Sequence, residues 1–231
     1  MKKIIYELNE VPKKLYEFYA NLFPESGFGK LLSKSLVYET HTADVGGLHP
    51  WVTWPTLHRG TSNVNHEISD LGQDLNKVNN EYPSIFNLLA NKDIKVGVFG
   101  SLHSYPLPEN LENYTFYVPD TFAAGKECFP KILSTFQSFN LSMVKRSGRN
   151  VSSGIAIKDA SKFIINAKAL GLTWPTFINL GKQILGEQFQ KDRLVRRRTS
   201  QVEISFDLYY QQLIETKPEI SFFFTNHVAS S

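Results

Sequence analysis

The fold class is decided by the stretch Ile94-Lys95-Val96-Gly97-Val98-Phe99-Gly100. A short apolar run that ends in glycine is typical of a strand buried on both faces, as in a parallel sheet. A helix is expected before it, because Pro83 suits a first helical turn and the apolar residues between Ile85 and Leu89 recur at helical spacing. A helix that leads into a buried strand is the repeating unit of an α/β domain.

The segments outward from this unit continue the alternation. Strands are predicted over Ile4–Leu8, Tyr114–Val118 and Glu219–Thr225, and a helix over Pro12–Phe23. We therefore expect an α/β fold with a largely parallel sheet flanked by helices. Such folds place the ligand site beyond the carboxyl ends of the strands. Polar residues follow three of the predicted strands and are the candidates: Asn9, Glu10, Ser101, His103, Asn226 and His227.

The part of the chain between the third and last strands is predicted to be helical. Apolar periodicity indicates helices over Phe129–Val144, Ile155–Leu170, Trp174–Gln190 and Val195–Ile214. We expect residues 125–217 to form a helical insert or cap over or beside the ligand edge, within a single α/β domain that spans residues 1–231. Arginine and lysine side chains from this cap would meet an anionic substrate.

Composition excludes several classes of protein. The chain has 231 residues, of which 42% are hydrophobic, so it is neither disordered nor of low complexity. The net charge is +3, but Lys191–Arg198 alone carries +4, so the basicity is local and does not indicate nucleic-acid binding. This basic run is predicted to be a solvated helix face, with contact to an anionic membrane surface or a polyanionic substrate as the alternative.

Cysteine usage and the first residues bear on the compartment. The single cysteine, Cys128, cannot form an internal disulfide and is predicted to be a buried free thiol, which fits a reducing compartment. The start of the chain lacks the apolar core of a signal peptide. Nowhere is there an uninterrupted apolar run of about 18 residues, so no membrane span is predicted. A cytoplasmic location is therefore expected.

Residues Glu39–Ser62 contain three glycines and two prolines and are predicted to form a site loop rather than a long regular element. Thr53 and Thr56 are the candidate nucleophiles in it. A hydroxyl before a proline that opens a helix lies near free backbone amides, which stabilise a transferring phosphate. Threonine needs a base or a metal for activation, and without an obvious neighbouring base a metal is favoured. The alternative is a structural loop with a capping threonine.

The same segment is rich in histidine and tryptophan. Four histidines, His41, His49, His58 and His66, are close in sequence, but their spacing follows no single helix or strand face, so a metal site built from them is not favoured. His49 and His58 flank Thr53 and are candidates for substrate contacts. The two tryptophans, at 51 and 54, are expected to pack in the core, with stacking on a sugar or base as the alternative.

The motifs and their order resemble the alkaline phosphatase superfamily, in particular the type I phosphodiesterase/nucleotide pyrophosphatase branch. The family has Asp-Gly after the first strand, a Thr-aromatic-Pro-Asn nucleophile loop, and a Thr-Gly-(five residues)-His-Gly segment. This chain has, at the matching places, Asn9-Glu10, Thr53-Trp54-Pro55-Thr56, and Arg59-Gly60-(five residues)-His66-Glu67. The stretch from Pro83 to His103 also resembles related sulfatases. The likeness covers residues 1–105 and 219–228.

This resemblance implies a metal-dependent hydrolase or transferase of phosphoric esters, with a small-molecule, glycan or lipid ester as substrate. Thr53 would be the nucleophile that becomes phosphorylated, and His103 would contact substrate. The ligands of a divalent metal, with zinc in two sites as the family pattern, would come from Asn9, Glu10, Thr53, Asn226 and His227. Because the family has further ligands after the last strand, we expect the N-terminal part of a longer domain, with an exposed sheet edge and without activity on its own.

Departures from the family pattern include Asn9, Glu10 and Glu67. Asn9 is neutral where the family has an aspartate, and Glu10 and Glu67 stand where it has glycines. An amide oxygen binds Zn²⁺ less well than a carboxylate, so the alternative function is a catalytically degenerate relative that binds a ligand or partner. A phosphoglycerate mutase-like or sulfatase-like relative is a third hypothesis, although a sulfatase needs Cys or Ser at Thr53. Asn9, Thr53, His103 and Asn226 are predicted to converge at one edge of the sheet.

Overall fold

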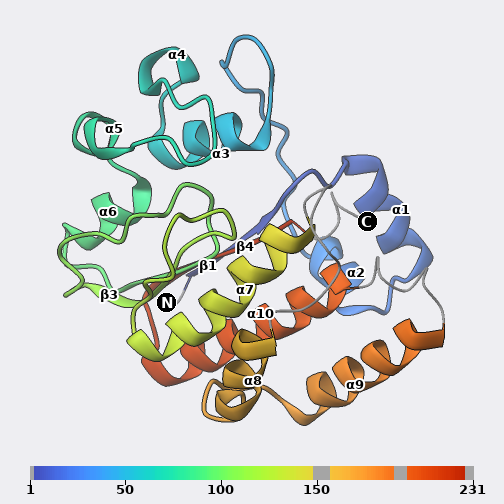
Figure 1. The fold of residues 1–231 in the computed structure, drawn as a ribbon. Helices are drawn as coiled ribbons and strands as arrows, with labels where there is room; N and C mark the ends of the chain where they lie inside the picture. Colours follow the sequence, from blue (N-terminus) through green and yellow to red (C-terminus); the bar gives the residue numbers. More distant parts are fainter. Residues whose placement is uncertain (1–2, 148–156, 190–196, 227–231) are drawn as a thin grey trace.

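The structure is a computed structural model that describes residues 3–147, 157–189 and 197–226. Its centre is a sheet of four parallel strands, β1 (Lys3–Leu8), β2 (Val96–Phe99), β3 (Tyr114–Val118) and β4 (Ile220–Thr225), in the order β1-β4-β2-β3. Helices flank it on both sides (Figure 1). The prediction of an α/β fold with a parallel sheet is confirmed. The last strand of the described chain, β4, lies between β1 and β2, so it pairs with the first strand next to one edge of the sheet.

Strand residues alternate between two cores. Phe99, Phe116 and Phe223 point to one face and pack with helices near the C-terminus, whereas Val98 and Phe222 point to the other face. This alternation is the period of two expected of a pleated strand. β1 is an edge strand with Lys3–Tyr6 exposed.

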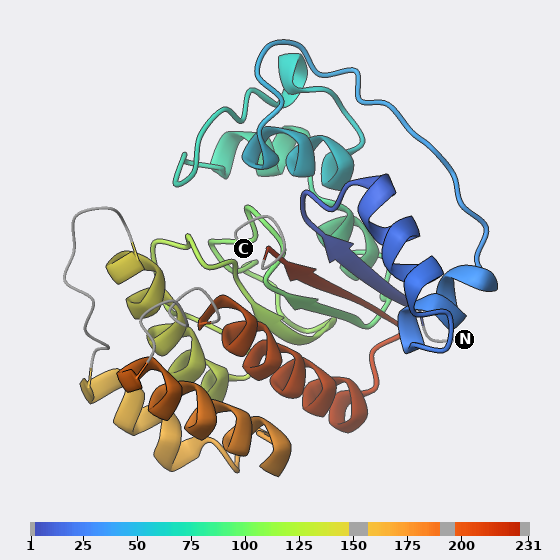
Figure 2. The same cartoon turned by 90° about the vertical axis from the view of Figure 1, so that its right-hand side faces the viewer.

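The helices after β3 form the layer on the Phe223 face (Figure 2). They follow a short 3₁₀ turn η1 (Lys131–Leu133) and are α7 (Ser134–Ser147), α8 (Ile157–Asn166), α9 (Trp174–Phe189) and α10 (Arg197–Thr216). All four helices predicted from periodicity are present within a few residues. Phe136, Phe163 and Leu208 from this layer are buried against the sheet. The layer is therefore a main part of the core.

The other elements surround β1 and the opposite face. α1 (Lys13–Leu22) and α2 (Gly27–Ser33) follow β1, and α6 (Ile85–Ala90) precedes β2. Ser26 and Ser84 cap α2 and α6 by accepting backbone N–H groups through their hydroxyls. Cys128 is free and buried, as predicted, and burial raises the pKa of its thiol to about 12.

The expectation of an irregular loop over Glu39–Ser62 is wrong for its second half. Pro50–Arg59 form the helix α3, which is followed by α4 (Asn63–His66) and α5 (Asn76–Glu81). Pro50 occupies the first turn and Gly60 ends the helix with φ 65°, a left-handed conformation that glycine adopts readily. The proline and glycine that suggested a loop are thus the boundaries of a helix.

Candidate functional site

Asn9 and Asn226 meet at the carboxyl edge of the sheet. β1 and β4 pair in register up to Leu8 and Thr225, so the next residue of each strand reaches the edge at the same level. The side-chain Nδ2 of Asn9 donates to Oδ1 of Asn226 over 2.6 Å. The predicted convergence of these two residues is therefore present, and it follows from the parallel register alone.

Helix α3 is joined to this amide pair by a tryptophan. The indole Nε1 of Trp54 donates to Oδ1 of Asn9 over 2.7 Å, and its ring packs edge-on against Phe224 at a centroid distance of 5.4 Å. Asn9 is buried, and both its carbonyl and its amino group are used in these hydrogen bonds. Trp54 thus packs partly in the core, as expected, and fixes the orientation of the Asn9 amide.

Thr53 lies in the first half of α3, one residue before Trp54. Its hydroxyl donates to the carbonyl of His49 over 3.3 Å, and its own N–H also bonds to that carbonyl. The helix therefore opens at Pro50 and not at Pro55, which corrects the premise that Thr53 precedes the opening proline. Thr53 is half-buried and remains beside the edge through its neighbour Trp54.

His103 compensates for the proline inside α3. Pro55 has no N–H, so the carbonyl of Trp51, four residues earlier, lacks its helical donor. The Nε2–H of His103 donates to this carbonyl over 2.8 Å. Burial lowers the pKa of His103 to about 4, so its ring is neutral at pH 7 with the proton on Nε2. The structure thus brings His103 to α3, near the predicted substrate side, with one ring nitrogen engaged by the backbone.

Thr56 belongs to a second polar cluster, with Asp44 and His66. Nδ1 of His66 accepts the backbone N–H of Ile68 over 3.0 Å, which leaves the ring proton on Nε2. That Nε2 lies 2.9 Å from the Thr56 hydroxyl and therefore donates to it, while the hydroxyl donates to Oδ1 of Asp44 over 2.7 Å. His66 cannot act as a base toward Thr56 in this arrangement. The cluster ties residues 44–49 to α3 and α4.

The ionisation states of this cluster agree with the hydrogen bonds. Partial burial raises the pKa of Asp44, but hydrogen bonds from Thr56 and the Asn63 amide outweigh it, so the pKa lies below its usual value. Burial lowers the pKa of His66. Asp44 is therefore a carboxylate and His66 a neutral imidazole at pH 7, which suits a structural clasp between loop and helix better than proton transfer.

A third cluster lies below α3, between the helix and the sheet. The carboxylate of Glu7 on β1 lies 2.7 Å from Nε2 of His58 and accepts a 2.8 Å hydrogen bond from Ser101, directly after Gly100. All three side chains are buried. His58 thus packs against the sheet, and its contact with Glu7 attaches the C-terminal half of α3 to β1 and to the segment after β2.

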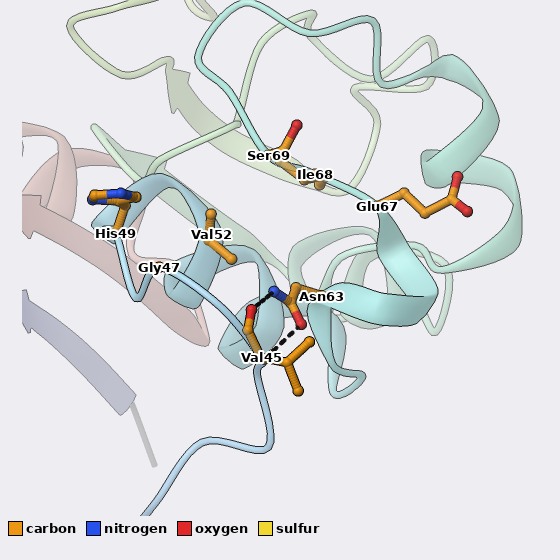
Figure 3. A pocket seen from close by; sticks show the side chains of 8 residues that line it. All are labelled: Val45, Gly47, His49, Val52, Asn63, Glu67, Ile68 and Ser69. Atoms are coloured by element: carbon orange, nitrogen blue, oxygen red, sulfur yellow. Dashed lines mark hydrogen bonds between the residues drawn. The ribbon is translucent and has the colours of Figure 1, made fainter.

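A pocket opens beside the start of α3 (Figure 3). It has a volume of about 300 Å³. Asn63 and the backbone of Val45 exchange two hydrogen bonds in its wall, of 3.1 and 2.8 Å. His49, whose ring stacks on Trp51 at 4.7 Å, forms another part of the wall. The lining residues are Val45, Gly47, His49, Val52, Asn63, Glu67, Ile68 and Ser69.

The resemblance implies zinc ligands at the carboxyl edge of the sheet, with Asn9, Glu10 and Asn226 among them. Within residues 3–147, 157–189 and 197–226, no three His, Cys, Asp or Glu side chains gather as metal ligands would. The oxygen of Asn9 accepts the Trp54 N–H and that of Asn226 accepts the Asn9 amide, so both oxygens face donors. Glu10 contributes only a long contact of 3.4 Å to Asn9. The predicted ligand His227 lies outside the described residues.

Asp120 was not among the residues predicted from the sequence, although it lies at the same edge. It is buried two residues after the end of β3, and its carboxylate accepts the backbone N–H of Phe122 over 2.8 Å. Burial raises its pKa to about 6. The rule that selected Asn9 and Asn226, a polar residue after a strand, would have selected Asp120 had it been applied to the third strand.

Comparison of this chain with known protein families, with curated proteins and with solved structures finds no match. In the part of the chain that the structure describes, no helix combines the length and apolar character required to cross a membrane.

Proposed function

We propose that this chain binds phosphoric esters at the carboxyl edge of its sheet, beside the first half of α3, in a site of the alkaline phosphatase type. The observation that carries this proposal is the backbone of Glu10 and Glu67. Both have left-handed φ angles, 51° and 54°, at the two positions where the family has glycine. A glutamate does not favour this conformation, which costs a residue with a Cβ about 1–2 kcal/mol.

The two left-handed positions support the resemblance independently of the residues that suggested it. Glu10 turns the chain directly after β1, and Glu67 ends α4 directly after His66. Left-handed backbone also occurs at Asp93, His103 and Lys217, and it is common where a helix ends, as at Glu67. A fold that requires a glycine-like turn at both places accounts for both, and an alkaline phosphatase-like fold has glycine at both. Strain of this kind is typical of functional sites.

The position of α3 supports an anionic ligand. Its N-terminal turn lies at the carboxyl edge, where Trp54 contacts Asn9, and the partial positive charge of a helix N-terminus attracts phosphate. Thr53 provides a hydroxyl one residue away. The ester would displace the present partners of Asn9 and Thr53, which are neutral groups apart from the Glu10 carboxylate at 3.4 Å from Asn9.

The amide pair favours binding without turnover. Activation of a threonine requires a base or a metal, and the oxygens of Asn9 and Asn226 face hydrogen-bond donors. A catalytically degenerate, ligand-binding role is therefore the function that these residues support best. Hydrolysis or transfer through Thr53 is the second candidate. It is favoured by the place of Thr53 on α3 beside the edge.

Titration with bis(p-nitrophenyl) phosphate, followed by the amide NMR signals, tests the proposal. We expect shifts at Asn9, Thr53 and Asn226, no release of nitrophenolate with or without added zinc, and weaker binding by Thr53→Val. Glu109→Gln, an exposed change elsewhere on the chain, is the matched control and should bind normally. Shifts confined to other surfaces would contradict the proposed site. Turnover that is abolished in Thr53→Ala would establish the second candidate instead.

A double variant separates the two candidates further. Asn9→Asp with Asn226→Asp places two carboxylates where the amides are now 2.6 Å apart. Like charges so close repel, and a divalent cation would relieve the repulsion. We expect the double variant to bind about one zinc per chain by elemental analysis and to gain thermal stability with zinc, unlike the wild type. Equal zinc binding by both proteins would contradict the view that the amides removed a metal site.

A further inference from the structure

Helix α9 carries an apolar stripe that the described residues leave exposed. Trp174, Ile178, Leu185 and Phe189 have exposed fractions of 79%, 53%, 59% and 84%. At about 100° per residue they fall within a sector of roughly 60°, and at about 1.5 Å per residue the stripe is roughly 22 Å long. Isolated exposed apolar residues are normal on a protein surface, but an aligned row of four with an aromatic ring at each end marks an interaction surface.

The other side of α9 anchors the helix to the domain. Phe177 and Leu180 pack against the core of the helical layer, and Thr176 and Gln183 are buried. α9 lies on the outside of that layer, far from the candidate site at the edge of the sheet (Figure 1). The stripe therefore faces outward on a helix whose opposite side is held in place.

The charge of the chain is concentrated in the same part of the sequence. Residues 157–198 contain nine basic and three acidic residues, a net charge of +6, whereas the whole chain carries +3. The remainder of the chain is thus at −3. Lys182, an exposed residue of α9, lies beside the stripe on the helix. Residues 191–196, which form most of the basic run Lys191–Arg198, lie outside the described residues.

We propose that α9 docks on an anionic lipid membrane, with the stripe of Trp174, Ile178, Leu185 and Phe189 inserted at the level of the headgroups. An interfacial helix combines an apolar face that carries Trp, Phe and Leu with neighbouring Lys and Arg. Each basic residue near an anionic surface adds to the attraction. The helix would lie in the membrane plane and would not span it.

Charge decides between a membrane and a second copy of the chain. If two copies packed through α9, residues 157–189 of both, each with four basic and two acidic residues, would approach each other, and repulsion between the like charges opposes association. An anionic bilayer attracts the same region. α1 also exposes apolar side chains, among them Phe18 at 64%, but residues 3–38 carry only five basic and four acidic residues. α1 therefore provides a matched control surface, apolar but without the charge.

Sedimentation with lipid vesicles tests the proposal. The full chain should bind vesicles of phosphatidylcholine with phosphatidylglycerol, bind phosphatidylcholine alone at least about tenfold more weakly, and lose binding at high salt. Phe189→Ser should weaken binding by about tenfold, as expected for one large apolar side chain, whereas Phe18→Ser should leave it unchanged. Equal binding to both lipids, or equal loss in both variants, would overturn the proposal.

Fluorescence identifies the helix that touches the lipid. Brominated lipids should quench the wild-type protein through Trp174, and Trp174→Phe should still sediment with vesicles but lose the quenching. Quenching that persists in Trp174→Phe would come from Trp51 or Trp54, and would overturn the assignment to α9. Light scattering tests the alternative that a second copy of the chain packs on the stripe. A dimer in solution that Phe189→Ser dissociates would support this alternative and contradict the proposal.

Discussion

Both faces of the sheet have an apolar core, but the helical layer and helix α3 are attached to the sheet by different kinds of interaction. On the face covered by α7, α8 and α10, aromatic rings dominate, as in the contacts of Phe99 with Phe136 at 5.8 Å and of Tyr209 with Phe223 at 4.6 Å. On the other side, α3 is attached by buried polar contacts, above all between Glu7 and His58. Burial of apolar area tolerates small shifts, whereas hydrogen bonds fix position and orientation. The candidate site lies beside α3, whose position is fixed by hydrogen bonds.

The largest expected loss of stability comes from a substitution in the aromatic core under α7, α8 and α10. Phe136 on α7 is almost completely buried between Phe99 and Phe163. Phe136→Ala should lower the free energy of unfolding by about 3–5 kcal/mol, because it removes a large side chain and leaves a cavity. Urea denaturation measures the loss. Phe206→Ala, on the half-exposed side of α10, is the control and should cost much less. Similar losses in both variants would show that burial does not set the stability of this face.

A medium effect concerns Asp120 and depends on pH. Its pKa is about 6 in the folded chain because of burial, against about 3.8 when unfolded. Between these two values the unfolded carboxyl is ionised and the folded one is protonated, so the wild type loses stability as the pH rises. Asp120→Asn cannot ionise. The variant should be about 1–3 kcal/mol more stable than the wild type at pH 8.

Thermal denaturation at several pH values checks this prediction. The advantage of Asp120→Asn should shrink as the pH falls through 6 toward 4, where both side chains are neutral. The exposed Asp70→Asn is the control and should show no such trend. A variant that is less stable than the wild type at pH 8 would mean that the carboxylate is stabilised in its charged form. The charged carboxylate of Asp120 would then be stabilised by its hydrogen bonds, and burial would not destabilise it.

The same contrast between the faces explains what the sequence could predict. Helices α7 to α10 and the four strands follow from apolar periodicity, which is a local property of the sequence. Their predicted ranges agree with the structure to within a few residues. α3 was predicted as a loop because Pro50, Pro55 and Gly60 were interpreted as breakers. Its interior proline is tolerated only because His103, some fifty residues later, donates to the carbonyl that Pro55 leaves free. No local pattern contains that contact.

The candidate site was predictable to the same limited extent. The meeting of Asn9 and Asn226 follows from parallel strands that end at one edge. The partners of those amides do not follow from it, because Trp54 reaches Asn9 only through the placement of α3. The roles of Thr56 and His66 depend on the ring proton, which is set by the backbone N–H of Ile68. Spacing in sequence predicts which residues are near one another, but not which of them donates.

The smallest effect tests the backbone that supports the proposed function. Glu67 and Glu10 adopt left-handed φ angles, so Glu67→Gly and Glu10→Gly each remove strain of about 1–2 kcal/mol. Glycine also increases the entropy of the unfolded chain, which offsets about 0.4–1 kcal/mol of this gain. Each variant should therefore be about 0.5–1 kcal/mol more stable than the wild type in urea denaturation, whereas most glycine substitutions destabilise.

Glu17→Gly supplies the matched control, because Glu17 is an exposed glutamate inside the ordinary helix α1. It should lose about 1 kcal/mol, opposite in sign to the two site variants. A loss of that size in Glu67→Gly and Glu10→Gly would mean that neither turn requires a glycine-like backbone, and the main support for an alkaline phosphatase-type site would be removed. A gain in both would show that the backbone is strained at the two turns, 57 residues apart, where the family has glycine. The sign of a small change in stability thus tests the proposed site without any substrate.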